Sequence, residues 1–261
     1  MVTQIRSPLF VPANRPERFA KAAGSGADAV ILDLEDAVAA DAKDAARAAL
    51  ATDFTDLPVI VRINAHGTPW HAADVAAVVA LRPAGVMLPK AEVAGVIETI
   101  TAASGRLPVI ALIESARGLA NARAIAEARG VQRLAFGSVD YCADLGCAHL
   151  RDVLLPARSE LVLASRLAGI AAPIDGVTVQ LDDLSISHDD AIHARNLGMT
   201  GKLCIHPRQI AEVRRAFAPS AQEIDWAQRV LASGDGAVSV DGAMVDEPVR
   251  IRARAILAGA G

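Results

Sequence analysis

Aromatic residues, cysteines and long apolar runs are scarce in this chain of 261 residues. Phe, Trp and Tyr make up only 3% of the sequence although 52% of it is hydrophobic, so the core must consist mainly of Ala, Val, Leu and Ile. Such a core is typical of parallel sheets that are covered by Ala-rich helices. No apolar run approaches the roughly 20 residues that a membrane-spanning helix needs, which argues against a membrane protein of that kind.

The chain also lacks a basic excess, a paired-cysteine motif and an N-terminal secretion signal. Its formal net charge is −4, so the composition gives no support for a nucleic-acid partner. The three cysteines, Cys142, Cys147 and Cys204, form no C-x-x-C pair and are odd in number. We therefore expect a protein of the reducing cytoplasm.

Short apolar runs alternate with amphipathic, Ala-rich stretches along most of the chain. The runs predict strands at Pro8–Val11, Ala29–Leu34, Val59–Ile63, Gly85–Leu88, Val109–Ile113, Leu134–Phe136, Gly176–Val179 and Leu203–Ile205. The amphipathic stretches predict helices at Lys43–Leu50, His71–Ala80, Ala91–Ala103, Leu119–Ala128, Ser159–Leu167 and Ala191–Leu197. Eight strands that alternate with helices predict an α/β protein with a (β/α)8 barrel. The alternative is an open doubly wound sheet, but no Gly-rich dinucleotide or P-loop fingerprint follows any strand.

The pattern changes near Pro219, so we predict a barrel over residues 1–218 and a C-terminal appendage over residues 219–261. The appendage is expected to contain a helix at 224–232, Gly234-Asp-Gly236, a short extended run, Asp241-Gly242 and a basic helix at 250–257. It is too short to be expected to bury a core of its own. We therefore expect it to complete the functional site or to pack on a neighbouring subunit.

Polar residues stand at the carboxyl ends of most predicted strands, where a barrel of this kind carries its chemistry. They are Asp33, Glu35, Asp36, Arg62, Asn64, Lys90, Glu114, Asp140, Asp144 and His206. Strands also end in polar residues simply because they emerge into water. Several members of this set, however, follow completely apolar runs and would be partly buried, where charges need partners or a metal. His206, which precedes Pro207, is interpreted as a turn or cap residue.

Glu114 and Asp140 are predicted to close successive buried strands, and two carboxylates so placed could share one hard divalent cation. Mg²⁺, with Mn²⁺ as a second candidate, suits one or two carboxylates together with waters and substrate oxygens. Zinc or iron would use His or Cys ligands, and the six histidines show no H-x-H or H-x-x-x-H spacing. Arg62 is suited to bind a substrate carboxylate or a developing enolate oxygen, because its planar fork binds bidentately and stays charged. An ion pair with the Asp33–Asp36 segment is the structural alternative, and both roles can hold together.

A series of motifs resembles the citrate lyase β-subunit-like enzymes of the HpcH/HpaI aldolase superfamily. The motifs are Arg6-Ser-Pro-Leu-Phe-Val-Pro12, Leu32-Asp-Leu-Glu-Asp-Ala-Val38, Val61-Arg-Ile-Asn64, Leu88-Pro-Lys90, Leu112-Ile-Glu114, Phe136-Gly-Ser-Val-Asp140, Ala143-Asp-Leu-Gly146, Gly201-Lys-Leu-Cys-Ile-His-Pro207 and Met244-Val-Asp246. They occur in order over nearly the whole chain. One position departs from the usual pattern, since Ala243 stands where the C-terminal motif commonly has a lysine.

The resemblance implies a TIM barrel of the phosphoenolpyruvate/pyruvate type that assembles into a homotrimer or hexamer. It implies a Mg²⁺-dependent lyase that cleaves or forms a 3-hydroxyacyl-CoA such as citryl-CoA, malyl-CoA or citramalyl-CoA. The products of cleavage would be acetyl-CoA and a 2-keto acid. By motif match, Glu114 and Asp140 take the metal positions and Arg62 the position that binds the keto-acid oxygens. Asp246 matches an acid that a neighbouring subunit often supplies, and it would handle the proton of the acetyl-CoA enolate.

The remaining acidic and basic residues have secondary roles in this hypothesis. Glu35 and Asp36 join Arg62 and Asp246 in the catalytic set, where they would orient Arg62 and metal-bound waters. Asp33 would lie with Arg62 and Glu114 in the substrate site. Arg15, Arg18 and Lys21, near the first helix, could meet the phosphates of CoA; their alternative role is ordinary helix-surface charge.

Three rival functions stay open at the level of sequence. A class II aldolase acting on free 2-keto-3-deoxy acids is one, but those relatives tend to carry a histidine where Asp36 stands. Thioester hydrolysis after the lyase step is another. The third is a non-catalytic regulator that binds CoA or a keto acid, which would have no need of Arg62, Glu114 and Asp140 together.

Overall fold

The computed structural model describes residues 2–234 and 236–259, and the chain divides into two compact units, Met1–Arg214 and Arg215–Gly261. This division lies close to the boundary after residue 218 that the sequence predicts. Within the described residues, no helix is long and apolar enough to cross a lipid bilayer.

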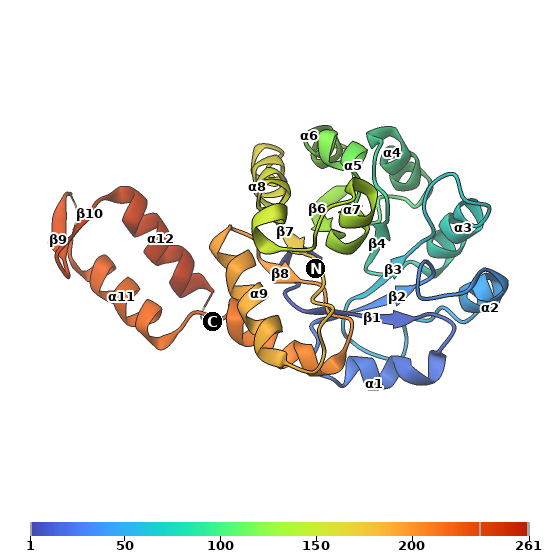
Figure 1. Ribbon diagram of the computed structural model, residues 1–261, viewed down its shortest axis with the longest axis horizontal. Coiled ribbons are helices and arrows are strands. Elements are labelled where there is room, and N and C mark those ends of the chain that lie inside the picture. The colour runs from blue at the N-terminus through green and yellow to red at the C-terminus, as the bar shows by residue number, and fades with distance from the viewer. Residues whose placement is uncertain (1, 235, 260–261) are drawn as a thin grey trace. The chain divides into compact units, whose positions relative to one another are not determined.

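The first unit is built on eight parallel strands that pair in chain order (Figure 1). They are β1 (Pro8–Pro12), β2 (Ala29–Asp33), β3 (Val59–Arg62), β4 (Gly85–Leu88), β5 (Val109–Ile113), β6 (Val131–Phe136), β7 (Ala171–Asp175) and β8 (Gly201–Lys202). The sheet closes where Leu9 and Cys204 form a parallel bridge. There the Phe10 amide donates to the Cys204 carbonyl over 2.9 Å, and the Cys204 amide donates to the Pro8 carbonyl over 2.9 Å. The predicted (β/α)8 barrel is confirmed, and the doubly wound alternative is wrong.

Helices connect the strands and cover the outside of the barrel (Figure 1). They are α1 (Phe19–Ala23), α2 (Lys43–Ala48), α3 (His71–Leu81), α4 (Ala94–Ala103), α5 (Ala116–Ala120), α6 (Ala122–Glu127), α7 (Ser138–Leu145), α8 (Arg151–Leu167), α9 (Leu184–Asn196) and α10 (Ile210–Phe217), with 3-10 turns at η1 (Val2–Gln4), η2 (Pro16–Arg18), η3 (Ala40–Ala42) and η4 (Pro207–Gln209). The helix predicted at 119–128 is divided at Asn121 into α5 and α6. Helix α7 is not predicted by the sequence, because the residues up to Asp140 resemble the continuation of a strand.

The predicted strand at Gly176–Val179 is wrong: β7 ends one residue before it, at Asp175. The Asp175 carboxylate is fully buried, 2.8 Å from Arg158 Nε and 3.0 Å from Lys202 Nζ. At Gly176 a β-carbon would lie 2.2 Å from Ser138 Oγ, so the chain passes this point only without a side chain. The apolar run that resembled a strand is therefore the loop that follows it. The last strand is similarly displaced, and only Cys204 of the predicted Leu203–Ile205 pairs with β1.

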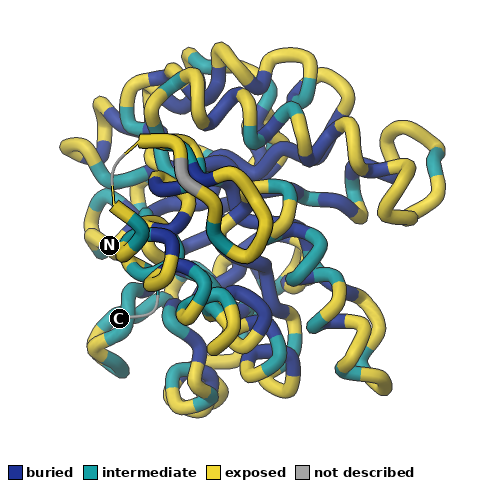
Figure 2. Tube along the Cα trace, turned by 90° about the vertical axis from the view of Figure 1, so that its left-hand side faces the viewer, coloured by how far each residue is buried: buried dark blue, intermediate teal, exposed yellow. Residues whose placement is uncertain are grey.

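The strands of the barrel are largely buried, as the dark blue segments of Figure 2 show, and apolar side chains of most of them pack together in a core. Its core cluster contains Ile31, Ile60, Met87, Ile110 and Leu112. Such a packed core leaves no room for a ligand, so the polar residues at the ends of the strands are the candidates for a functional site.

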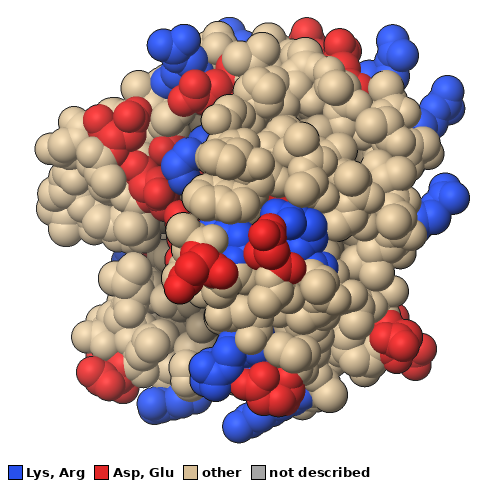
Figure 3. Space-filling model, turned by 90° about the vertical axis from the view of Figure 1, so that its right-hand side faces the viewer, with Lys and Arg blue, Asp and Glu red and all other residues tan. Residues whose placement is uncertain are grey.

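Acidic and basic side chains lie interspersed over the face of the barrel that carries α2 and α3 (Figure 3). Arg47 on α2 illustrates the pattern, because it contacts Asp44 and Asp74, each at 2.7 Å. Both signs of charge are therefore mixed on this face.

The C-terminal unit contains α11 (Ala221–Ala232), the antiparallel pair β9 (Val238–Val240) and β10 (Ala243–Val245), and α12 (Glu247–Ala258). Asp241 and Gly242, both with positive φ, make the turn between its two strands. Ala227, Val230, Val245 and Ala253 are buried together in this unit. The expectation that the appendage buries no core of its own was therefore wrong, since the two helices and β10 enclose a small one.

Candidate active site

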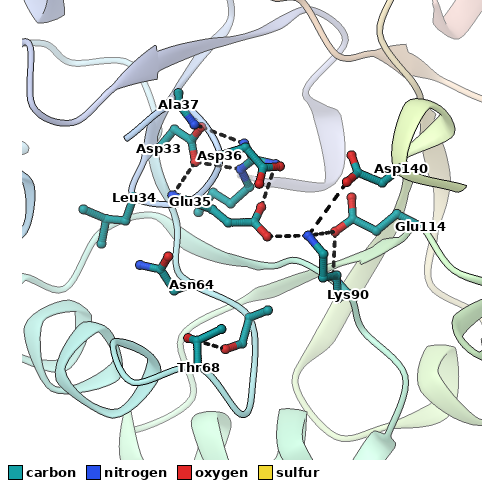
Figure 4. A network of polar contacts seen from close by, with 12 residues as sticks. Asp33, Leu34, Glu35, Asp36, Ala37, Asn64, Thr68, Lys90, Glu114 and Asp140 are labelled. Carbon is teal, nitrogen blue, oxygen red and sulfur yellow. Dashed lines mark hydrogen bonds and ion pairs between the residues drawn. The ribbon is translucent and has the colours of Figure 1, made fainter. Parts of the chain in front are cut away.

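Asp33, labelled in Figure 4, and Arg62 form a hydrogen-bonded ion pair in a polar cluster at the carboxyl ends of the strands. They are the last residues of β2 and β3 and face each other in the strand register. Arg62 Nε donates to Asp33 Oδ1 over 2.7 Å, and Arg62 Nη2 donates to Oδ2 over 2.6 Å. Asp33 also accepts the Glu35 amide at 2.9 Å. Its oxygens are thus occupied in orienting Arg62 and the loop that follows β2.

The remaining nitrogen of Arg62 contacts the acids of that loop. Arg62 Nη1 lies 2.9 Å from Glu35 Oε2 and 3.6 Å from Asp36 Oδ2. The guanidinium also stacks on the Phe10 ring at 4.8 Å from its centroid. Burial alone would lower the pKa of Arg62, but the charge and hydrogen bonds of Asp33 and the charges of Glu35 and Asp36 outweigh it, so the pKa is raised. Arg62 is therefore a permanent, immobilised cation.

Lys90 lies at the centre of the cluster, although the sequence analysis gave it no specific role. Its backbone adopts a φ of 46°, and its amide donates to Glu114 Oε1 over 2.8 Å. Its ammonium donates to Glu35 Oε1 over 2.7 Å and lies 3.7 Å from Glu114 and 3.8 Å from Asp140 (Figure 4). Burial works to lower the pKa of Lys90, but the hydrogen bond and charge of Glu35 and the charge of Glu114 raise it overall.

Glu114 and Asp140 meet at this ammonium from different kinds of element. Glu114 directly follows β5, as predicted. Asp140 does not close a strand: β6 ends at Phe136, and Asp140 lies in the first turn of α7. The Glu114 side chain is buried, whereas that of Asp140 is 41% exposed. The pair therefore offers one inner carboxylate and one that faces solvent.

The electrostatics of the cluster favour an additional cation. Five carboxylates, those of Asp33, Glu35, Asp36, Glu114 and Asp140, surround the two cations Arg62 and Lys90. Burial, followed by the charge of Glu35, raises the pKa of Glu114 to about 8, against the opposing charge of Lys90. Burial also raises the pKa of Glu35, which Arg62 opposes. A bound cation would stabilise the charged form of these acids.

The donor set fits a hard divalent ion that keeps open coordination positions. Among residues 2–234 and 236–259, no group of three or more His, Cys, Asp and Glu is arranged to enclose a metal by itself. Glu114 and Asp140 instead provide two carboxylates beside a cavity. Mg²⁺ is commonly bound in that way, with waters and substrate oxygens as its other ligands.

A cavity of about 440 Å³ opens beside these groups, lined on its polar side by Asp36, Arg62, Glu114 and Asp140. Its other walls are mainly apolar and come from Phe10, Pro12, Leu112, Phe136, Val139, Val177, Val179, Leu203 and Ile205. A ligand with a charged head and an apolar or uncharged body would match this lining.

A second cavity, of about 430 Å³, shares Phe10, Pro12 and Ile205 with the first. Arg18 and Lys21, two of the three predicted CoA contacts, line it. Arg15, the third, is in neither lining and contacts Glu17 at 2.6 Å.

Three other residues of the predicted set have structural contacts. Asn64 donates its amide and its side-chain nitrogen to Asp74, over 2.8 and 2.6 Å. Asp144 accepts the Ala116 amide at 2.7 Å. His206 caps η4, which confirms its interpretation as a cap residue.

Asp246 is carried by the C-terminal unit, where it begins α12. Its carboxylate accepts the Val249 amide at 3.4 Å, so the residue is the N-cap of that helix. Its proposed part in proton transfer stays a prediction.

Lys43 is a residue of the site that the sequence analysis did not identify. Its ammonium donates to the carbonyls of Leu34 and Glu35, each over 2.7 Å, although the side chain lies on α2. It thereby holds the loop that presents Glu35 and Asp36. Nothing in the sequence distinguishes it from a surface lysine.

The chain is similar to known proteins over most of its length. The HpcH/HpaI aldolase/citrate lyase family matches residues 6–207. A citrate lyase subunit beta-like protein from Mycobacterium tuberculosis is 42% identical over 264 residues, covering 97% of this chain and 94% of the relative. A (3S)-malyl-CoA thioesterase from Cereibacter sphaeroides is 35% identical over 269 residues, covering 98% of this chain and 94% of the relative.

A solved structure extends the likeness to the whole chain. The crystal structure of protein CitE from Mycobacterium tuberculosis in complex with magnesium, acetoacetate and coenzyme A matches with a TM-score of 0.90 and 41% sequence identity, covering 99% of both chains. The chain therefore belongs to the HpcH/HpaI aldolase/citrate lyase family.

Proposed function

We propose that this protein is a Mg²⁺-dependent carbon–carbon lyase. It would cleave a 3-hydroxyacyl-CoA into acetyl-CoA and a 2-keto acid, or form the 3-hydroxyacyl-CoA from these two compounds. One observation carries the proposal: the immobilised Arg62 and the Glu114–Asp140 pair line the same cavity. A keto acid needs both a fixed cation and a metal beside it, and a CoA thioester needs an adjoining channel. The solved structure of a relative in complex with magnesium, acetoacetate and coenzyme A supports ligands of this kind.

In this reaction the keto acid would bind with its carboxylate and carbonyl between Arg62 and the two metal-binding carboxylates. Both oxygens of Asp33 accept hydrogen bonds from Arg62, so the orientation of the guanidinium is already fixed. Arg62 would therefore lose little conformational freedom when a ligand binds. A preorganised cation of this kind stabilises the negative charge of the carbonyl oxygen, which is an alkoxide before cleavage and becomes one again as the carbon–carbon bond forms. Mg²⁺ held by Glu114 and Asp140 would supply Lewis acidity toward the same carbonyl.

The thioester would extend into the cavity lined by Arg18 and Lys21. Pro12 and Ile205 belong to both linings, so the reacting end and the nucleotide end could be bound at once. The two basic side chains suit the phosphates of CoA. We infer no such role for Arg15, which contacts Glu17.

Asp246 would transfer the proton at the α-carbon of the thioester, supplied by the C-terminal unit of a neighbouring copy in a trimer or hexamer. This role needs a carboxylate free to accept a proton. Among the described residues, the hydrogen-bond partner of the Asp246 carboxylate is the Val249 amide, at 3.4 Å, which leaves lone pairs of its oxygens available.

Hydrolysis of the thioester is a second candidate, because a relative with 35% identity over nearly the whole chain is a (3S)-malyl-CoA thioesterase. The two activities leave different products. Cleavage of the carbon–carbon bond yields a keto acid and keeps the thioester intact, whereas hydrolysis releases free thiol.

The test is to mix the purified protein and Mg²⁺ with citryl-CoA, malyl-CoA and citramalyl-CoA and to assay keto acid and free thiol separately. Keto acid without thiol supports the lyase, and thiol supports hydrolysis. Glu114→Ala and Asp140→Ala should each abolish turnover while the circular dichroism spectrum stays native, and the exposed Asp53→Ala serves as the control. Full activity in either variant would exclude the metal assignment.

A further inference from the structure

Three carboxylates from three separate elements converge on the Lys90 ammonium (Figure 4). Glu35 comes from the loop after β2, Glu114 follows β5, and Asp140 belongs to α7. Their nearest oxygens lie 2.7, 3.7 and 3.8 Å from Nζ. Two of these acids are the proposed metal donors. A cation of the chain itself thus neutralises the oxygens that a divalent ion would bind.

Lys90 is attached to this place by its backbone as well as by its charge. Its amide donates to Glu114 Oε1, the same oxygen that faces the ammonium. The amide hydrogen bond orients Glu114 whatever side chain position 90 carries. A substitution of Lys90 can therefore remove the charge and leave the carboxylate in position.

The ammonium is bound unequally to the three acids. The 2.7 Å contact with Glu35 is a hydrogen bond, whereas the contacts with Glu114 and Asp140 are longer ion pairs without one. The side chain is 42% exposed, and a lysine has a flexible four-carbon stem. Nζ can therefore withdraw from Glu114 and Asp140 while it keeps its hydrogen bond to Glu35.

We propose that the Lys90 ammonium is an internal counter-ion, which neutralises Glu114 and Asp140 in the metal-free protein and withdraws toward Glu35 when a divalent cation binds. The inference rests on the proposed metal site and adds to it a residue that sets the affinity of that site. The metal must displace a positive charge, so its apparent affinity is lowered by the free energy of the contacts that it replaces.

The same arrangement affects the metal-free protein. Without Lys90, the charges of Glu35, Glu114 and Asp140 would repel one another across the cluster, and Arg62, which contacts Glu35, would offset them only in part. Loss of the lysine should therefore destabilise the metal-free protein and strengthen metal binding. A lysine that bound substrate only would have neither effect.

Isothermal titration of the full chain with Mg²⁺, in the absence of any substrate, tests the inference. Lys90→Met removes the charge and keeps most of the aliphatic stem, and Lys90→Gln keeps an N–H donor for Glu35. We expect each to bind Mg²⁺ about tenfold more tightly than the wild type, because a nearby unit charge is lost. Lys21→Met, which makes the same change in net charge in the second cavity, should stay within about twofold of the wild type.

Thermal unfolding with and without Mg²⁺ gives an independent readout. Lys90→Met should unfold at a lower temperature than the wild type without metal, and saturating Mg²⁺ should recover most of the difference. Unchanged or weaker Mg²⁺ binding in both Lys90 variants would overturn the inference even if the wild type binds the metal. A wild type that binds no Mg²⁺ would overturn the proposed metal site as well.

Discussion

Gly137 faces the Glu114 carboxylate so closely that a β-carbon at position 137 would lie 2.3 Å from Glu114 Oε2. The φ of Gly137 is −88°, which any residue can adopt, so the requirement for glycine is steric, and the three atoms nearest to the added β-carbon all belong to Glu114. The turn between β6 and α7 therefore leaves the space that the Glu114 carboxylate occupies.

Gly137→Ala should displace Glu114 and reduce Mg²⁺ affinity and lyase turnover by at least tenfold. The cause is the position of one carboxylate, so the circular dichroism spectrum should stay native. Gly95→Ala is the matched control, because a β-carbon there has no atom within 4 Å, and its activity should equal that of the wild type. Normal Mg²⁺ binding by Gly137→Ala would mean that Glu114 is not a ligand.

Mg²⁺ binding should depend on pH, since the pKa of Glu114 is raised to about 8 by burial and by the charge of Glu35. The metal binds the ionised carboxylate, so its apparent affinity should rise by one to two orders of magnitude between pH 6 and pH 8 and then level off. Metal-free protein should show the opposite trend in stability. Its folded state holds this proton more tightly than the unfolded chain does, so the contribution of Glu114 to stability falls as the pH rises from about 4.5 toward 8.

Titration calorimetry at several pH values measures the first effect. Glu114→Gln removes the titrating group and should bind Mg²⁺ weakly without this pH dependence. A wild-type affinity that is flat between pH 6 and pH 8 would contradict the assignment of Glu114 as the titrating ligand.

The fold could be predicted from the sequence because its strands are apolar runs of the right length. Val109–Ile113 is a run of five buried residues, and the structure reproduces its predicted bounds. The prediction failed where tertiary contacts override composition. The true β7 contains Ala171, Ala172 and Pro173, which carry little strand signal, and the more strand-like residues after Gly176 form a loop. There, the buried contacts of Asp175 determine the end of the strand.

The acids of the candidate site and Arg62 could be predicted from the sequence, because each stands near the carboxyl end of a predicted strand or a few residues beyond it. The contacts among these residues could not be predicted from the sequence. Lys90 reaches Glu35 across 55 positions of sequence, and Lys43 reaches back to the loop after β2 from a helix. Long lysine side chains can contact acids at many distances, and only the packed structure selects one. The sequence predicts Asp140 at the end of a strand because apolar residues precede it. Such residues are equally compatible with a strand that ends at Phe136 and a helix that begins at Ser138.

Arg62→Lys should reduce kcat/KM by about 100-fold, because a lysine cannot replace the planar fork that holds Asp33 and faces the substrate. The loss of one charge-assisted hydrogen bond to a buried carboxylate should also lower the free energy of unfolding by about 2 kcal/mol. Steady-state kinetics and urea unfolding measure the two effects. The exposed Arg117→Lys should change neither, and an Arg62→Lys enzyme with native kcat/KM would remove Arg62 from the reaction.

Asp246→Asn can separate a catalytic role of this residue from its role as the N-cap of α12. Asparagine caps helices about as well as aspartate, so the unfolding temperature should not change. It cannot take up a proton, so exchange of the acetyl-CoA methyl protons with deuterated solvent, followed by NMR, should slow by two to three orders of magnitude. Asp246→Ala should slow the exchange equally and also lose the cap, which costs about 1 kcal/mol. If Asp246→Asn exchanges at the wild-type rate and only Asp246→Ala is impaired, Asp246 serves the helix and another group transfers the proton.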